Sequence, residues 1–126
     1  MPLTARYEAP AADGAIVTKA VMNAAGRLGV SNRVLARVLG LSEASISRMG
    51  SGSYKLEPPD KPFEVAVLFL RLFRALDSIV GGDESAARRW IGSENRALGG
   101  APIQLIQSLA GLVNVVGYLD ARRGLL

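Results

Sequence analysis

Three acidic side chains near the middle of the sequence are the first candidates for chemistry, because they fall within eight residues of one another. Glu57, Asp60 and Glu64 could supply the carboxylate pair that general acid/base catalysis requires. The sequence has no histidine and no cysteine, so it lacks the commonest metal ligands and the usual base near neutral pH. Helix capping and solvation explain the three carboxylates more simply. We therefore predict no catalytic residue, no metal site, no cofactor and no enzyme activity.

A second group of side chains suits the recognition of DNA. Arg48 offers the bidentate contact that guanine accepts, and serine hydroxyls can contact any base. The residues predicted to face base edges are Ser42, Glu43, Ala44, Ser47 and Arg48. The predicted phosphate contacts come from Arg27, Arg33, Arg37 and Lys55.

These side chains meet on one surface only if the segment from Asn32 to Met49 forms a helix-turn-helix. Gly40 permits the tight turn, and Ala36 is small where the second helix must cross closely. Ser31 or Asn32 can cap the first helix, and the Ser42 hydroxyl can reach the amide near Ser45 to cap the second. The shared core would come from Leu35, Leu39, Leu41, Ile46 and Met49.

A structural interpretation of the same segment stays open. Serine, alanine and glutamate make a poor reading surface, and Glu43 would repel phosphate. A helix-turn-helix can also serve as a packing or dimerisation scaffold that touches no DNA.

Charge and hydropathy point to partners. Residues 1–55 hold seven basic and three acidic residues while residues 56–126 hold eight of each, so the net charge of +4 belongs to the N-terminal part. Hydrophobic residues make up 49% of the chain, and the mean hydropathy is +0.24. Some apolar surface should therefore meet a partner or a second copy.

We expect a cytoplasmic protein, because no signal sequence opens the chain and charges interrupt its most apolar segment, 63–80.

The helical periodicity predicts an all-α fold with an N-terminal helix-turn-helix module followed by a small helical domain. No segment shows the alternation of a strand. Further helices are expected from Asp60 to about Val80, from Asp83 to Ile91, from Pro102 through Leu109 and from Gly111 to about Arg123. The predicted divisions are a flexible arm at 1–13, the helix-turn-helix module at 14–55, a linker at 56–62 and the second domain at 63–126.

From residue 87 onward the sequence carries an unusual pattern of restricted residue types. Its members are Trp90, Asn95, Leu98, Gly99, Gly100, Pro102, Leu105, Gly111, Val115 and Leu119. Over about residues 64–123 this pattern resembles the toxin-binding domain of the Xre/MbcA/ParS antitoxins, and an Xre-like helix-turn-helix ahead of it matches the family's usual order. The sequence departs from the family pattern at Glu94, where proline is frequent, and at Ile91, where leucine is.

Structural roles account for most of these residues without the family. Trp90 is most simply a core residue at the end of an amphipathic helix. Asn95 should satisfy backbone groups of a turn, and Gly99 and Gly100 should adopt conformations closed to other residues. Gly111 is expected at a close helix contact. These residues build the domain and need not touch a partner.

The resemblance implies a partner, which is a RES-domain toxin with an ADP-ribosyltransferase-like site that uses NAD. In such pairs the antitoxin covers the toxin's NAD cleft, and the C-terminal segment is expected to approach it. The corresponding residues here are Tyr118, Asp120, Arg122, Arg123, Gly124, Leu125 and Leu126. One of the two arginines could pair with a catalytic carboxylate or take the place of the nicotinamide ring, and the two leucines could fill an apolar pocket. The alternative is that both arginines only favour the helix C-terminus electrostatically.

Two functions remain after the sequence has been considered. The first is an antitoxin that buries its toxin's active site and also represses its own operon. It would act as a homodimer or as a hetero-oligomer with the toxin, it would bind operator DNA, and it would not bind a membrane. The second is a stand-alone transcription regulator whose C-terminal helices serve only to dimerise.

Overall fold

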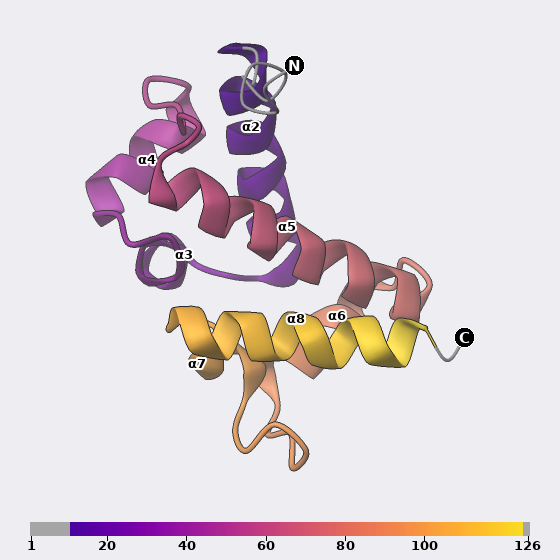
Figure 1. Ribbon diagram of the computed structural model, residues 1–126. Coiled ribbons are helices and arrows are strands. Elements are labelled where there is room, and N and C mark those ends of the chain that lie inside the picture. The colour runs from indigo at the N-terminus through magenta and orange to yellow at the C-terminus, as the bar shows by residue number, and fades with distance from the viewer. Residues whose placement is uncertain (1–10, 125–126) are drawn as a thin grey trace, which may run out of the picture.

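The computed structural model describes residues 11–124, and every regular element among them is a helix (Figure 1). The all-α prediction is confirmed. The helices are α2 (Ala11–Leu28), α3 (Asn32–Leu39), α4 (Glu43–Ser51), α5 (Lys61–Val80), α6 (Glu84–Gly92), α7 (Pro102–Leu105) and α8 (Leu109–Arg123).

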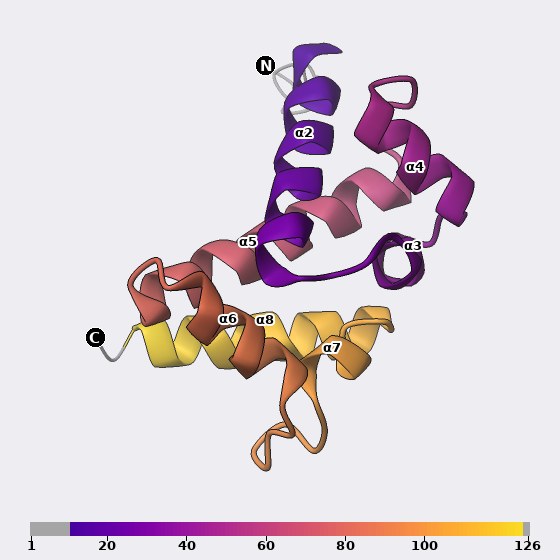
Figure 2. The same ribbon diagram turned by 180° about the vertical axis from the view of Figure 1, so that it is seen from behind.

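The long helix α5 lies at the centre of the arrangement. It begins after Asp60, has Pro62 in its first turn and ends at Gly81, whose φ of 63° is the left-handed conformation that stops a helix. The sequence predicted these bounds. α5 contacts α2 and α3 on one side and α6 and α8 on the other, as Figures 1 and 2 show from opposite directions.

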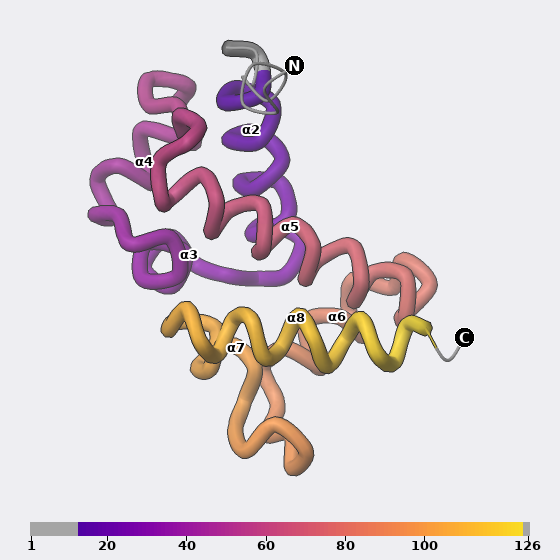
Figure 3. Tube along the Cα trace, viewed as in Figure 1, coloured from indigo at the N-terminus to yellow at the C-terminus, as the bar shows by residue number. Residues whose placement is uncertain are grey.

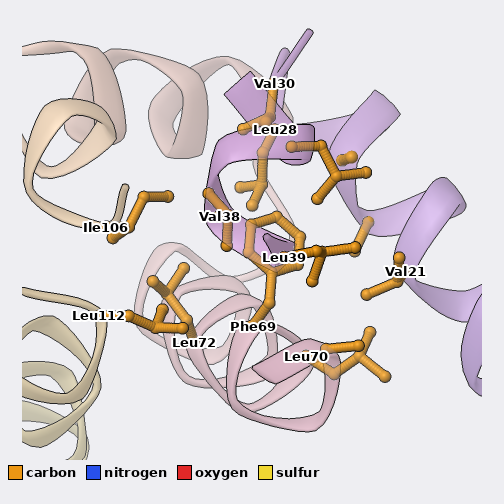
Figure 4. Close-up of a cluster of buried hydrophobic side chains, with 14 of the residues drawn as sticks. Val21, Leu28, Val30, Val38, Leu39, Phe69, Leu70, Leu72, Ile106 and Leu112 are labelled. Atoms are coloured by element: carbon orange, nitrogen blue, oxygen red, sulfur yellow. The ribbon is translucent and has the colours of Figure 1, made fainter. Parts of the chain in front are cut away.

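One hydrophobic core extends through both halves of the chain. Phe69 and Leu72 of α5 are fully buried, as are Ile106 and Leu112 from the C-terminal part. Figure 4 shows Phe69 beside Val38 and Leu39 of α3, with Leu72, Ile106 and Leu112 grouped nearby. Residues 56–62 lie between α4 and α5, and the hydrophobic core includes residues on both sides of them. The predicted division into two domains at this segment therefore stays a prediction.

The loop after α4 is fastened to the start of α2. The Thr18 hydroxyl donates to the carbonyl of Gly14 over 2.6 Å and accepts from the amide of Leu56 over 2.9 Å. Gly14 lies so close to the carbonyl oxygen of Leu56 that a Cβ at this position would overlap it. α2 starts at Ala11, inside the stretch predicted as a flexible arm. The predicted linker is thus anchored at its first residue, because Leu56 is only 1% exposed.

The C-terminal helices differ from the predicted ones. α7 ends at Leu105 instead of continuing through Leu109, and the last helix begins at Leu109 instead of Gly111. Ser108 explains the difference, because its hydroxyl accepts from the Gly111 amide over 3.0 Å and so caps α8. The chain therefore turns between the two helices where the sequence pattern suggested continuity.

Within the described residues, no helix has both the length and the apolar character that crossing a bilayer requires.

Candidate functional site

The helix-turn-helix has the predicted caps. The Ser31 hydroxyl, rather than Asn32, caps α3 by accepting from the Val34 amide over 3.2 Å. The Ser42 hydroxyl accepts from the Ser45 amide over 3.1 Å and caps α4. Gly40 ends α3 with a φ of 71°, which is the left-handed turn that the sequence required.

The outward side of α4 carries the predicted base-facing residues. Ser42, Glu43, Ser47 and Arg48 are all exposed, whereas Ser45, Ile46 and Met49 are buried. The Arg48 guanidinium lies 6.0 Å from the centre of the Tyr54 ring and donates to the Ser45 hydroxyl over 3.3 Å. Arg48 is therefore held close to its own module and would have to extend in order to reach a base.

The residues predicted to contact phosphate differ in whether their side chains already bind other groups of the protein. Arg33 is exposed and has no carboxylate at ion-pair distance in the described part of the chain. Arg37 donates to the side-chain oxygen of Gln107 over 3.4 Å, and Lys55 lies 3.8 Å from the Glu57 carboxylate. Arg27 pairs with Asp77 at 3.6 Å and Glu84 at 3.4 Å, and its guanidinium lies 5.0 Å from the Phe73 ring centre. Arg33 is thus the most available cation of the set.

Within the described residues, the three carboxylates near residue 60 form no cluster that could hold a metal ion. Glu57, Asp60 and Glu64 are all exposed, and Glu57 pairs with Lys55. Asp60 occupies the N-cap position of α5 without accepting a side-chain hydrogen bond.

Between α6 and α7 the chain forms a loop that projects away from the helices, as the tube in Figure 3 shows. Asn95 closes this loop: its amide donates to the Gly100 carbonyl over 3.0 Å, and its side-chain oxygen accepts from the Leu98 amide over 3.1 Å. The predicted turn role of Asn95 is confirmed. Gly99 has a φ of 81° as expected, but Gly100 has no positive φ, so only the first glycine needs a left-handed conformation.

Two further pattern residues fix the corner between α7 and α8. Pro102 is buried at the first position of α7. Gly111 packs so tightly that a Cβ there would overlap the carbonyl oxygen of Leu105, which confirms the predicted close contact.

An aromatic pair lies beside the C-terminal end of α8. The rings of Trp90 and Tyr118 stack with centroids 6.3 Å apart and an interplanar angle of 19°. Trp90 packs against the core but is only half-buried, so it is less enclosed than the sequence suggested. The Arg122 guanidinium lies 5.5 Å from the Tyr118 ring centre, and Nη1 donates to the Tyr118 hydroxyl over 3.3 Å. Tyr118 thus contacts both Trp90 and Arg122.

The other residues of the predicted C-terminal site have different surroundings. Asp120 pairs with Arg71 of α5 at 2.5 Å, which ties α8 to the central helix. Arg123 is exposed, and Gly124 follows the last turn of α8. Leu125 and Leu126 lie outside the described residues.

Comparison with protein families gives two matches that together cover most of the chain. Residues 8–71 match the antitoxin Xre-like helix-turn-helix domain, and residues 75–124 match the antitoxin Xre/MbcA/ParS C-terminal toxin-binding domain. The chain belongs to the Xre/MbcA/ParS-type antitoxins. No curated protein matches it.

In Figures 1 and 2, helix α4 and the C-terminal end of α8 lie at opposite ends of the antitoxin. Arg88 joins α6 to the end of α2, because Nε donates to the Arg27 carbonyl and Nη2 to the Gly26 carbonyl, each over 3.0 Å. Both carbonyls belong to the last turn of α2, where intrahelical partners are lacking, and that of Gly26 also accepts from the Gly29 amide over 3.2 Å. This contact was not predictable from the sequence, because an arginine on an exposed helix gives no signal of which distant helix end it reaches.

Proposed function

We propose that the antitoxin neutralises a RES-domain toxin, an ADP-ribosyltransferase-like protein that uses NAD, by placing the C-terminal end of α8 over the toxin's active site. The arrangement of Arg122 carries this proposal. Its guanidinium is exposed to solvent yet held by Tyr118, so it loses little side-chain freedom when it meets a carboxylate or a vacant nicotinamide subsite. Arg123 lies beside it and is free to make a second contact.

Removal of residues 122–126 tests the mechanism. We expect the truncated antitoxin to keep its helical circular dichroism spectrum and still to bind the toxin, but to leave NAD consumption at least ten times faster than the full chain does. The reason is that the last buried residue of α8 is Leu119, so the truncated chain keeps the residues on which its fold depends. It would lack the arginines that are proposed to lie over the toxin's active site.

Single substitutions sharpen this test. Arg122→Ala should weaken inhibition, while Arg89→Ala should not, because Arg89 is an exposed arginine of the same domain that donates only to Ser85 of its own helix. Full inhibition of NAD consumption by the truncated chain would rule out the tail mechanism.

We further propose that the antitoxin binds its own operator DNA through the exposed N-terminal end of α4. The family match to an antitoxin helix-turn-helix supports this, as does the exposure of Ser42, Ser47 and Arg48. The basic excess of residues 1–55 would favour approach to the phosphate backbone.

Arg33→Ala should lower operator affinity and reduce the slope of log K against log salt by about one, as expected when one phosphate contact is lost. Arg74→Ala serves as the control, since Arg74 is an exposed arginine on α5, outside the helix-turn-helix. A salt titration by fluorescence anisotropy measures both variants. Equal slopes for Arg33→Ala and the unmodified antitoxin would remove Arg33 from the DNA contact.

A further inference from the structure

The N-terminal part of α4 and its cap carry the five side chains that the sequence predicted to face base edges. They are Ser42, Glu43, Ala44, Ser47 and Arg48, and all five are exposed. Helix α4 lies at the outer edge of the molecule in Figures 1 and 2. A polar group that already has a partner within the protein must give up that bond before it can contact DNA. The groups without such a partner therefore decide which bases this surface prefers.

Two of the five side chains already form hydrogen bonds to Ser45. The Ser42 hydroxyl accepts from the Ser45 amide over 3.1 Å and donates to the Ser45 hydroxyl over 3.0 Å, so its only hydrogen is in use. The Arg48 guanidinium donates to the same Ser45 hydroxyl over 3.3 Å and lies 6.0 Å from the centre of the Tyr54 ring. Ser45 is buried, so these bonds hold both side chains against the module. A contact from Arg48 to guanine would cost the bonds that Arg48 now makes.

The other three side chains are Glu43, Ala44 and Ser47. None of them forms a side-chain hydrogen bond or an ion pair with another residue that the structure describes. Ala44 has no polar group in its side chain. The Ser47 hydroxyl both donates and accepts, so it can contact any base and distinguishes them poorly. A carboxylate only accepts, so Glu43 can attract one kind of base edge and repel another.

One base presents an edge in the major groove that suits a lone acceptor. Cytosine offers the N4 amino group and has no acceptor of its own beside it. Adenine offers the N6 amino group, but its N7 acceptor lies next to this group and would repel a carboxylate. Guanine and thymine present acceptors and no donor in this groove. We infer that Glu43 selects a cytosine in the operator by accepting a hydrogen bond from its N4 amino group.

The position of Glu43 in α4 supports this role. Glu43 is the first residue of the helix, and the start of the second helix is the part of a helix-turn-helix that meets base edges. The Ser42 cap and the bond from the Ile46 amide to the Ser42 carbonyl, over 3.1 Å, fix the backbone that carries its side chain. The inference rests on the proposed function in one respect, which is that α4 binds operator DNA.

The negative charge of Glu43 also contributes to selectivity. A carboxylate near the phosphates of DNA lowers the affinity for every duplex, whatever its sequence. Only a base that donates to the carboxylate offsets this loss. An acidic residue on the DNA-facing surface therefore separates the correct site from other sites more than it strengthens binding.

Glu43→Gln in the full-length antitoxin tests the inference. Glutamine has nearly the same shape, but its amide both donates and accepts, which matches N7 and N6 of adenine. The antitoxin selects its preferred duplexes from a double-stranded DNA library of random sequence, and fluorescence anisotropy then measures the affinity for each selected duplex and its single-pair variants. For the unmodified antitoxin we expect a C·G pair whose replacement weakens binding by about tenfold. In Glu43→Gln the preference at that pair should change to A·T, and the other preferences should stay.

Glu64→Gln is the matched control. Glu64 is an exposed carboxylate in the first turn of α5, so this variant loses the same charge from the same part of a helix. It should keep the preference for cytosine. Acidic residues in a first turn also stabilise a helix through its dipole. If Glu43 acted only in this way, Glu43→Gln would lower the melting temperature and leave the preferred bases unchanged.

Three results would contradict the inference, and they differ in what else they exclude. Unchanged base preferences in Glu43→Gln would overturn it and leave operator binding in place. So would a site whose main preference is for guanine and is lost in Arg48→Ala, because Arg48 would then select the base. If the unmodified antitoxin selected no sequence at all, operator binding itself would be overturned, and the role of Glu43 with it.

Discussion

Phe69→Ala is expected to destabilise the whole antitoxin in a single step, lowering the free energy of unfolding by about 3–5 kcal/mol. Phe69 is 0% exposed at the middle of α5, where it lies beside Val38 and Leu39. The cavity left by the ring would loosen α3 from α5, and α5 is also the support for α6 and α8. Domains of this size have stabilities of about 5–15 kcal/mol, so the loss is a large part of the total.

Urea unfolding measures this effect with two probes. Far-ultraviolet circular dichroism reports all the helices, and the fluorescence of Trp90 reports the C-terminal half, because Trp90 is the only tryptophan. Both midpoints should fall together by about 2 M, for a slope of about 2 kcal/mol per M. Val67→Ala on the same helix is the control and should change stability by no more than about 0.5 kcal/mol. Separate midpoints for the two probes would contradict a shared core.

Gly111→Ala and Gly117→Ala should shift the stability of the free antitoxin in opposite directions, although both place the same methyl group in the same helix. At Gly111 the methyl group would overlap the Leu105 carbonyl oxygen and approach the Ser108 hydroxyl, so the α7–α8 corner would have to open. We expect a loss of about 3 kcal/mol or more, at the upper end of overpacking costs. At Gly117 the space is open, and we expect a gain of up to about 1 kcal/mol.

Thermal unfolding of the two variants beside the unmodified antitoxin gives the result directly. The expected order of melting temperatures is Gly117→Ala highest, the unmodified chain next and Gly111→Ala lowest. If Gly111→Ala melted with the unmodified chain, the tight contact between α8 and the Leu105 backbone would be refuted.

Local chemistry made much of the fold predictable. Ser31, Ser42 and Asp83 cap helices with side-chain hydrogen bonds to amides three residues further on, a distance that sequence alone reveals. Gly40 and Gly81 stop helices by conformations that other residues rarely adopt. The resemblance of the C-terminal pattern to an antitoxin family also needed only the order and spacing of residues, and the family matches confirm it.

Contacts between distant segments decided the rest. Whether an arginine is free depends on which carboxylates the fold brings near it, so Arg27 and Arg33 look alike in the sequence but differ in the structure. Gly111 and Gly117 also look alike in the sequence. Only the packing shows that backbone fills the space of a Cβ at Gly111 and that this space is open at Gly117.

Sequence by itself determined the all-α class, most of the capped helix ends and the family, because capping, turns and periodicity act within a few residues. The tertiary structure alone decided that α5 joins both halves in one core, that Asp120 is engaged by Arg71, and that Leu109 and Val113 remain uncovered. The physical reason is that burial and ion pairing depend on which faces of separate helices meet, and residue spacing along one helix does not record this.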